Sequence, residues 1–171
     1  MGIKKYICLF FLVWLFVAAC GYRFAGNGEF PEETNRIFVE VLENRTSETG
    51  VENIVTSELL KEFTLRKTNN LAGSPDDADA LLSGVIQFVI IQTISPKGKD
   101  AASERRVTVT VDLKLAQKDG QVIWTAKSLT DNEGYKIDEN KERTEQNKRE
   151  ALRVLSQRIA ERTMNRLSDD F

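Results

Sequence analysis

The residues of this sequence that are best suited to acid–base chemistry are carboxylates in turn-like stretches. Glu32 and Glu33 form one pair, and Asp76, Asp77 and Asp79 form a second cluster. Two carboxyl groups act as acid and base only where their surroundings separate their pKa values, and runs of this kind are solvated. The chain has no histidine, which excludes Ser-His-Asp and Cys-His relays and the usual zinc sites. We therefore expect no enzyme activity, no catalytic residues, no metal and no small-molecule cofactor.

Cys20 lies in a context that predicts covalent lipid attachment. Lys4 and Lys5 precede 14 uninterrupted apolar residues, 6–19, a run too short to span a bilayer but typical of a signal peptide. The run ends in Val-Ala-Ala-Cys, which resembles the lipobox of bacterial lipoproteins, where a peptidase cuts before a cysteine that carries a diacylglyceryl thioether. We expect residues 1–19 to be removed and Cys20 to carry diacylglycerol and an N-acyl chain. A plain secretory peptide with a chance cysteine is the alternative.

Lipidation at Cys20 would fix the membrane to which the chain is attached. Each buried methylene contributes about 0.8 kcal/mol, so two or three acyl chains make attachment effectively permanent. Gly21, not an aspartate, follows the cysteine, and in lipoproteins resembling this one that choice usually allows transfer to the outer membrane. We expect a lipid-anchored protein on the periplasmic side of the outer membrane.

The charge balance of the mature chain excludes one class of partner. Lys4 and Lys5 leave with the signal peptide, so 22 basic side chains face 26 acidic ones and the formal charge falls from −2 to −4. Nucleic-acid binding needs a basic excess that is absent here.

The mature chain divides into two parts. Residues 20–35 are rich in glycine and predict a lipidated linker, and residues 36–171 predict a single domain.

Hydrophobic periodicity predicts six secondary-structure elements in that domain. Alternation of apolar and polar residues predicts strands, and apolar residues at three- and four-residue steps predict helices. The expected strands are 37–42, 78–95, 107–115 and 121–129, and the expected helices are 48–67 and 141–167. The order β-α-β-β-β-α predicts an α+β fold, a two-layer α/β sandwich whose four-stranded mixed sheet has two helices on one face.

The connections also predict the polarity of the domain. A β-α-β crossover makes the first two strands parallel, and two hairpins then reverse the chain twice. The loops 96–106 and 130–140 should therefore emerge at one end of the sheet. The start of the first strand, with the lipid-bearing segment, should lie at the other end.

The face of the sheet without helices is one candidate binding surface. We expect it to present apolar Val85, Val89 and Ile91 beside Thr108 and Thr110, a mixture that suits a semi-polar protein partner. An ordinary solvent-facing antiparallel sheet is the alternative.

Basic residues around the two loops form a second candidate. Lys97, Lys99, Arg105, Arg106 and Lys136 could converge on phosphates or carboxylates. Acidic residues in the same loops weaken the field, so solvated loops are the alternative.

Taken in order, the motifs of the mature chain resemble the LPS-assembly lipoprotein family, LptE. They are Cys20–Phe24, Ile37–Val41, Glu43–Thr46, Ala78–Gly84, Arg106–Leu115, the Gly120 turn, Trp124 and the carboxy-terminal helix. The resemblance implies a two-layer sandwich that plugs the β-barrel LptD in a 1:1 complex, helps to assemble it and binds lipopolysaccharide during transport to the cell surface. It would place the basic residues where lipopolysaccharide phosphates pass. The alternative is a periplasm-facing scaffold lipoprotein of another envelope complex that does not bind lipopolysaccharide.

Overall fold

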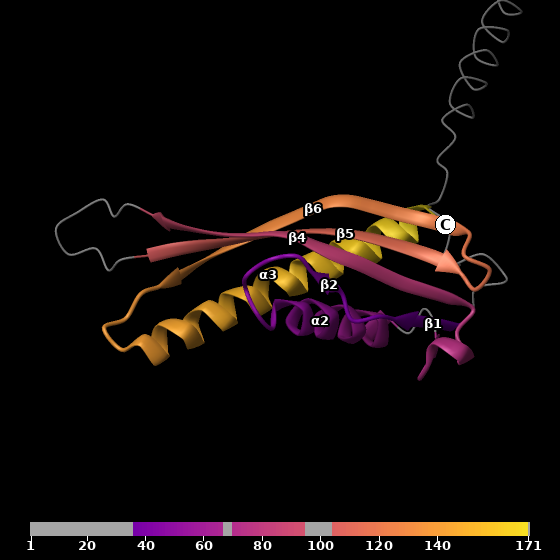
Figure 1. The fold of residues 1–171 in the computed structure, drawn as a ribbon, viewed down its shortest axis with the longest axis horizontal. Coiled ribbons are helices and arrows are strands. Elements are labelled where there is room, and N and C mark those ends of the chain that lie inside the picture. Colours follow the sequence, from indigo (N-terminus) through magenta and orange to yellow (C-terminus); the bar gives the residue numbers. More distant parts are fainter. Residues whose placement is uncertain (1–35, 67–69, 95–103, 171) are drawn as a thin grey trace, which may run out of the picture.

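The structure, a computed structural model, describes residues 36–66, 70–94 and 104–170. Two helices, three long strands and several short elements follow one another along the chain (Figure 1). They are β1 (Arg36–Val39), β2 (Glu43–Asn44), α2 (Val51–Arg66), β3 (Asn70–Leu71), the 3-10 turn η1 (Pro75–Asp77), β4 (Ala80–Ile94), β5 (Glu104–Gln117), β6 (Val122–Lys136) and α3 (Lys141–Asp170). The predicted order is confirmed, with β2 and β3 as short additional strands.

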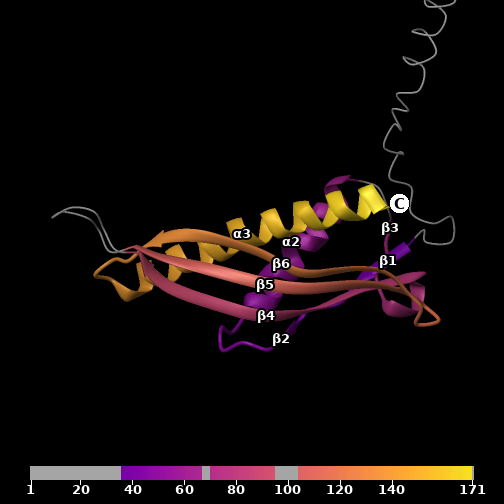
Figure 2. The same ribbon diagram turned by 90° about the horizontal axis from the view of Figure 1, so that it is seen from above.

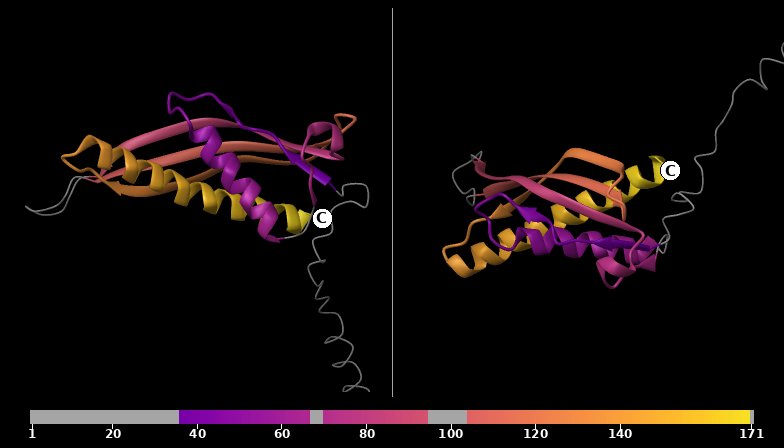
Figure 3. Two further views of the ribbon diagram at one scale, coloured as in Figure 1. Left: turned by 90° about the horizontal axis from the view of Figure 1, so that it is seen from below. Right: turned by 45° about the vertical axis from the view of Figure 1, so that its right-hand side comes forward.

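The strands form one mixed sheet with both helices on the same face (Figures 1 and 3). The strand order is β3-β1-β4-β5-β6, and β2 continues the line of β1 along β4. β1 and β4 are parallel, whereas β4, β5 and β6 pair antiparallel. The predicted two-layer α/β sandwich is therefore confirmed.

Strand register also confirms the predicted polarity (Figure 2). At one end, which we call the near end, Ile37 of β1 pairs with Ala80 at the start of β4. At the opposite, far end, Glu104 pairs with both Ile94 and Lys136. The predicted signal peptide, Cys20 and the predicted linker 20–35 lie outside the described residues.

The core lies between the sheet and the two helices. Alternate residues of β5 from Val107 to Leu115 are buried and face α3. The predicted stripe of α3, including Leu152, Leu155 and Ile159, is buried against them. At the near end the indole Nε1 of Trp124 donates to Asp170 Oδ2 at 2.8 Å, which satisfies the buried N–H group.

The helices cover unequal lengths of the sheet. α3 runs along most of its length, whereas α2 lies under the near half (Figure 3). Two polar contacts mark the extent of α2 beside α3: Lys148 Nζ pairs with Glu48 Oε1 at 2.8 Å, and Arg66 Nη1 donates to Asn165 Oδ1 at 2.8 Å. Of the described helices, α3 alone therefore reaches the far end of the sheet.

The expected end of the last strand at residue 129, followed by a loop 130–140, was wrong. β6 continues to Lys136, and its polar residues Asp131 and Tyr135 are buried on the helix side. The Asp131 carboxylate accepts from Arg158 Nε at 3.0 Å and is also paired with Arg162, both from α3. The inward residue at this point of β6 is a carboxylate that arginines of α3 neutralise. This part of the strand therefore lacks the hydrophobic alternation by which a strand is predicted from sequence.

The expected placement of Val89 and Ile91 on the uncovered face was also wrong. A β-bulge shifts the register of β4 between Ile86 and Phe88, so every later side chain changes face. Val89 pairs with Val109 and Ile91 with Val107, and both valines of β5 are fully buried on the helix side. Val85, before the bulge, keeps its place on the uncovered face, where it pairs with Asp112.

Candidate functional site

The face of the sheet turned away from the helices is the main candidate surface, and we call it the outer face. In the part of the chain that the structure describes, no helix covers it (Figures 1 and 3). Its members follow from strand register. From β4 they are Ser83, Val85, Phe88, Ile90, Gln92 and Ile94, from β5 Glu104, Arg106, Thr108, Thr110, Asp112 and Lys114, and from β6 Thr125, Lys127, Thr130, Asn132, Gly134 and Lys136.

The near half of the outer face is hollowed. A shallow depression of about 460 Å³ lies over β4 and β5, and Val41, Ser83, Val85, Lys114 and Lys127 are among its lining residues. The Val41 side chain is 64% exposed. Apolar side chains here alternate with charges of both signs, which suits contact with a semi-polar protein surface.

The middle of the outer face is held by one carboxylate. Asp112 Oδ2 accepts from Gln87 Nε2 at 2.9 Å, and Asp112 Oδ1 accepts from the Ser128 amide at 2.7 Å. Gln87 lies in the bulge of β4, and Ser128, with φ of 54°, lies in a bulge of β6. Asp112 therefore links the bulge of β4 to this bulge of β6.

The far half of the outer face combines exposed apolar groups with hydroxyls. Phe88 and Ile90 are 60% and 48% exposed. They pair with Thr110 and Thr108 of β5, and the Thr110 hydroxyl lies 3.0 Å from that of Thr130 on β6. The bulge thus replaces the predicted Val89 and Ile91 with Phe88 and Ile90 on this surface. Local alternation gives no signal for a single inserted residue, so the sequence pattern missed both.

The predicted cations are only partly brought together. Lys97 and Lys99 lie outside the described residues. Arg105 and Arg106 belong to β5, not to a loop, and consecutive strand residues point to opposite faces. Arg105 therefore shares the helix face with its cross-strand neighbour Tyr135, so the expected convergence was wrong for this residue.

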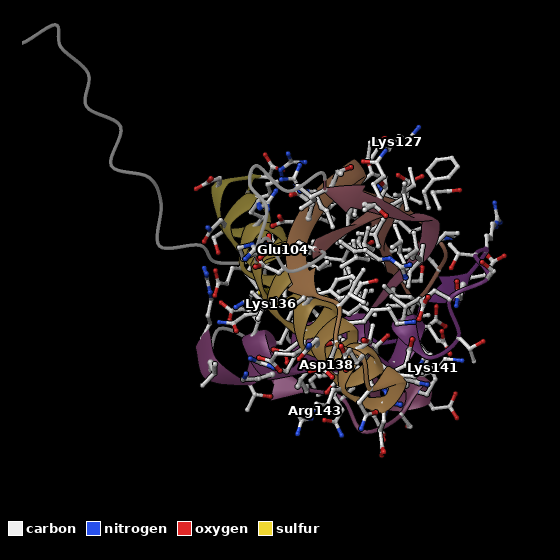
Figure 4. All side chains as sticks on the ribbon, turned by 90° about the vertical axis from the view of Figure 1, so that its left-hand side faces the viewer. Glu104, Lys127, Lys136, Asp138, Lys141 and Arg143 are labelled. Carbon is white, nitrogen blue, oxygen red and sulfur yellow. The ribbon has the colours of Figure 1, made fainter. Side chains whose placement is uncertain are left out.

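By strand register, Arg106 and Lys136 do share the outer face at the far end, where Figure 4 labels Lys136 and its register partner Glu104. Glu104 pairs directly with Lys136 in register, but within the described ranges neither cation has a side-chain hydrogen bond or an ion pair. Nearby, the start of α3 adds Lys141 and Arg143, of which Arg143 reaches Asp138 at 3.7 Å (Figure 4). Arg106 and Lys136, which are exposed and unpaired in the described ranges, can donate hydrogen bonds to phosphate or carboxylate groups.

The Glu43–Thr46 motif is a structural turn that leads into α2. Asn44 Oδ1 accepts from the Thr46 amide at 2.9 Å, and Asn44 Nδ2 donates to Glu52 Oε2 at 2.8 Å. Hydrogen bonds from its own main-chain amide, from Asn44 and from Gly50 hold the pKa of the Glu52 carboxyl below its usual value, outweighing the opposing effect of burial. The carboxylate thereby satisfies free amides at the start of the helix.

Lys148 links this turn to α3. Burial alone would lower the pKa of its ammonium group, but hydrogen bonds to Glu48 and Glu145 outweigh burial and raise the pKa. The charged form of Lys148 is therefore the form that fits between the two helices.

The described ranges contain neither a metal site nor a membrane-spanning helix. None of their groups of His, Cys, Asp and Glu could hold a metal ion. No helix there has the length and apolar character needed to cross a membrane.

The domain described above matches one protein family over nearly its whole length. The family model of LptE, described as lipopolysaccharide-assembly, matches residues 34–167. The chain belongs to the LptE family. The motifs from Ile37 to the carboxy-terminal helix lie within the matched range.

Solved structures share the fold at low sequence identity. A minor lipoprotein from Acinetobacter baumannii is 16% identical, with 81% of this chain and 93% of that chain covered and a TM-score of 0.52. An uncharacterized lipoprotein B from Nitrosomonas europaea is 12% identical, with coverages of 83% and 86% and a TM-score of 0.52. No curated protein sequence matches the chain significantly. At these identities the likeness establishes the fold alone.

Proposed function

We propose that this member of the LptE family is an outer-membrane lipoprotein that plugs and helps assemble the β-barrel LptD and binds lipopolysaccharide during its transport to the cell surface. The family match over residues 34–167 carries the proposal. The polarity of the domain supports it, because the chain enters β1 at the near end while Arg106 and Lys136 lie at the far end. The role is one of positioning and binding, without catalysis.

The near end is the membrane end in this proposal. Residues 1–19 are removed, Cys20 receives the acyl chains, and residues 20–35 connect the lipid to β1. Two or three acyl chains would hold the protein at the membrane through salt washing. Cleavage before Cys20 depends on its thioether, so the test replaces residues 1–19 with an ordinary secretory signal peptide and combines this with Cys20→Ala. That chain should be released into the wash, and its retention on the membrane after processing would show that lipid is not the anchor.

The outer face is the surface that meets the barrel wall. The interior of an outer-membrane barrel is polar, and Thr108 and Thr110 offer hydroxyls beside the apolar Val85, Phe88 and Ile90. A stoichiometric large β-barrel should therefore co-purify in detergent with the full-length chain. Its absence would favour a scaffold lipoprotein of another envelope complex.

The far-end cations are the lipopolysaccharide site in this proposal. Arg106 and Lys136 have no competing ion pair in the described part of the chain. Lys97 and Lys99, which precede Arg106 by nine and seven positions, belong to the same proposed site, whereas Arg105 is on the helix face and contributes less. Phosphates of lipopolysaccharide would form charge-assisted hydrogen bonds with these groups.

Charge reversal tests the site with a control from the same strand. Arg106→Glu together with Lys136→Glu should weaken lipopolysaccharide binding about tenfold, since each exposed contact contributes up to about 1 kcal/mol. Arg105→Glu places the same reversal on the opposite face and should have a smaller effect. Barrel co-purification should survive in both variants. Unchanged lipopolysaccharide binding in the double variant at moderate salt would remove these cations from the proposal.

A further inference from the structure

One edge of the sheet changes character halfway along β4. β1 pairs with β4 up to Leu82, and β2 pairs with it at Val85 and Ile86. From Phe88 to Ile94, β4 pairs only with β5, and no other strand within residues 36–66, 70–94 and 104–170 lies against its second side. This segment, Phe88–Ile94, is here called the open edge.

Strand register fixes which main-chain groups the open edge presents. In an antiparallel pair, residues alternate between bonding the neighbouring strand and facing away from it. On β6 the carbonyls of Thr130 and Asn132 face away from β5, because side chains of α3 bond them from outside. Their partners on β5 must therefore bond β4, through Phe88 and Ile90.

The residues between those two then face outward. Val89, Ile91 and Thr93 direct their N–H and C=O groups away from β5, into the open edge. These outward groups form a row in which successive residues are about 7 Å apart. None of them has a hydrogen-bond partner in the described part of the chain.

The opposite edge of the same half-sheet is closed. Arg162 Nη1 donates to Thr130 O at 3.0 Å, Arg158 Nη2 donates to Asn132 O at 2.7 Å, and Asn147 Nδ2 donates to Lys136 O at 3.0 Å. A bulge and charged side chains such as Lys127 further interrupt that edge. α3 thus caps one edge of the far half, whereas the other is left for another partner.

The composition of the open edge has none of the features that usually block strand addition. Its seven residues, FVIIQTI, include no charge, no proline and no glycine. Phe88, Ile90 and Ile91 are all exposed, Ile91 by 38%. A long, apolar, unpaired edge of this kind pairs readily with another chain unless a native partner covers it.

We propose that the open edge is a strand-addition site for an extended segment of the barrel partner. A lipid acyl chain cannot satisfy a row of alternating donors and acceptors, whereas a polypeptide strand matches it. Phe88 and Ile90 belong both to this edge and to the outer face, so the added strand is continuous with the surface proposed to meet the barrel wall. The inference rests on the proposed function for the identity of the partner and adds the mode of contact.

Site-specific crosslinking of the assembled complex tests which chain occupies the edge. A benzophenone amino acid is placed at Ile91 or Gln92 of the full-length chain, and the complex is irradiated and purified. Both positions should crosslink to one segment of the barrel. The same group at Leu65, which is 66% exposed on α2, is the control and should not reach that segment. Crosslinks to residues 20–35 of the same chain, to a second copy, or to nothing in an intact complex would each overturn the proposal.

Removing one edge amide tests the hydrogen bonding itself. Thr93→Pro deletes an outward N–H that the sheet does not use, and Thr93→Val keeps it while also losing the hydroxyl. In cells that also express the unaltered chain, the proline variant should enter barrel complexes about fivefold less than the valine variant, as expected for one lost hydrogen bond. Equal incorporation would overturn strand addition.

The outcomes also separate this inference from the proposed function. If no barrel co-purifies with the unaltered chain, the proposed function itself fails. If the barrel co-purifies equally with both Thr93 variants and crosslinks at neither edge position, strand addition alone fails. If Thr93→Pro lowers the thermal unfolding midpoint of the full chain, its weaker incorporation reflects lost stability. The crosslinks at Ile91 and Gln92 then decide whether strand addition holds.

Discussion

The Ser128 amide donates a 2.7 Å hydrogen bond to Asp112 Oδ1, across the bulge where β6 leaves its regular register with β5. Ser128 has φ of 54°, a left-handed conformation that costs a residue with a Cβ atom about 1–2 kcal/mol. The other carboxylate oxygen accepts from Gln87 in the bulge of β4. One aspartate thus stabilises the bulge of β4 at Gln87 and the bulge of β6 at Ser128.

Loss of that carboxylate should destabilise the domain. Asp112→Ala removes both hydrogen bonds and leaves the strained Ser128 amide without its acceptor, so we expect about 1–3 kcal/mol lower free energy of unfolding in urea. Ser128→Gly, which tolerates positive φ, should be close to neutral in the native background. It should also recover part of the loss when it is combined with Asp112→Ala. A strictly additive double variant would argue against a shared role.

Asp131 should be the polar residue on which the far half depends most. Asp131→Ala leaves Arg162 without a carboxylate partner and Arg158 with Glu133 alone, and we expect a loss of about 1–3 kcal/mol, moderated because both guanidinium groups reach solvent. Glu150→Ala breaks the exposed pair with Arg153 and serves as the control, with a much smaller effect. Similar unfolding midpoints for the two variants would contradict this assignment.

Acid should weaken the start of α2 through Glu52. Because the folded-state pKa of Glu52 lies below its unfolded value of about 4.3, its contribution is present above that pH and is lost as the pH falls through the folded pKa. Glu52→Gln should therefore lose less stability than the native chain between pH 6 and pH 3, as measured by urea unfolding. A Glu52→Gln variant that lost as much stability as the native chain over this range would contradict the assignment.

Ser156 is a site where a smaller side chain should stabilise the protein. Its hydroxyl is fully buried in α3 and finds no hydrogen-bond partner among the residues that the structure describes. Ser156→Ala should raise the free energy of unfolding by up to about 1–2 kcal/mol. Thr163 is equally buried, but its hydroxyl donates to Ile159 O at 2.8 Å, so Thr163→Val should lower stability instead. Thermal melts that moved both variants in the same direction would contradict the distinction.

The long elements were predictable because their patterns are strong. The alternation from Val107 to Leu115 identifies a strand with one buried face, and the stripe from Leu152 to Leu167 identifies the long helix. Connectivity then determined which loops share an end. These features depend only on neighbours along the chain.

The candidate surface was less predictable because it depends on contacts between distant residues. The bulge at Gln87 is held by Asp112, which lies 25 positions away, and it exchanges the residues that face outward. The last part of β6 depends on Arg158 and Arg162, which are invisible to any local pattern. The sequence pattern predicted a loop for Arg105 and Arg106, because charged residues at a strand end show no apolar alternation. In the structure both residues belong to β5 and therefore point to opposite faces of the sheet.

The unequal reach of the two helices divides the domain by rigidity. Main-chain amides of the near half are enclosed between β1, β4 and two helices, whereas those around Phe88–Ile94 lie at an edge supported from one side. Local opening of the far half can therefore occur while the near half stays folded, with faster hydrogen–deuterium exchange at the tip. The molecule combines a stiff near half with a compliant tip, which lets the far half adjust to its surroundings without unfolding the domain.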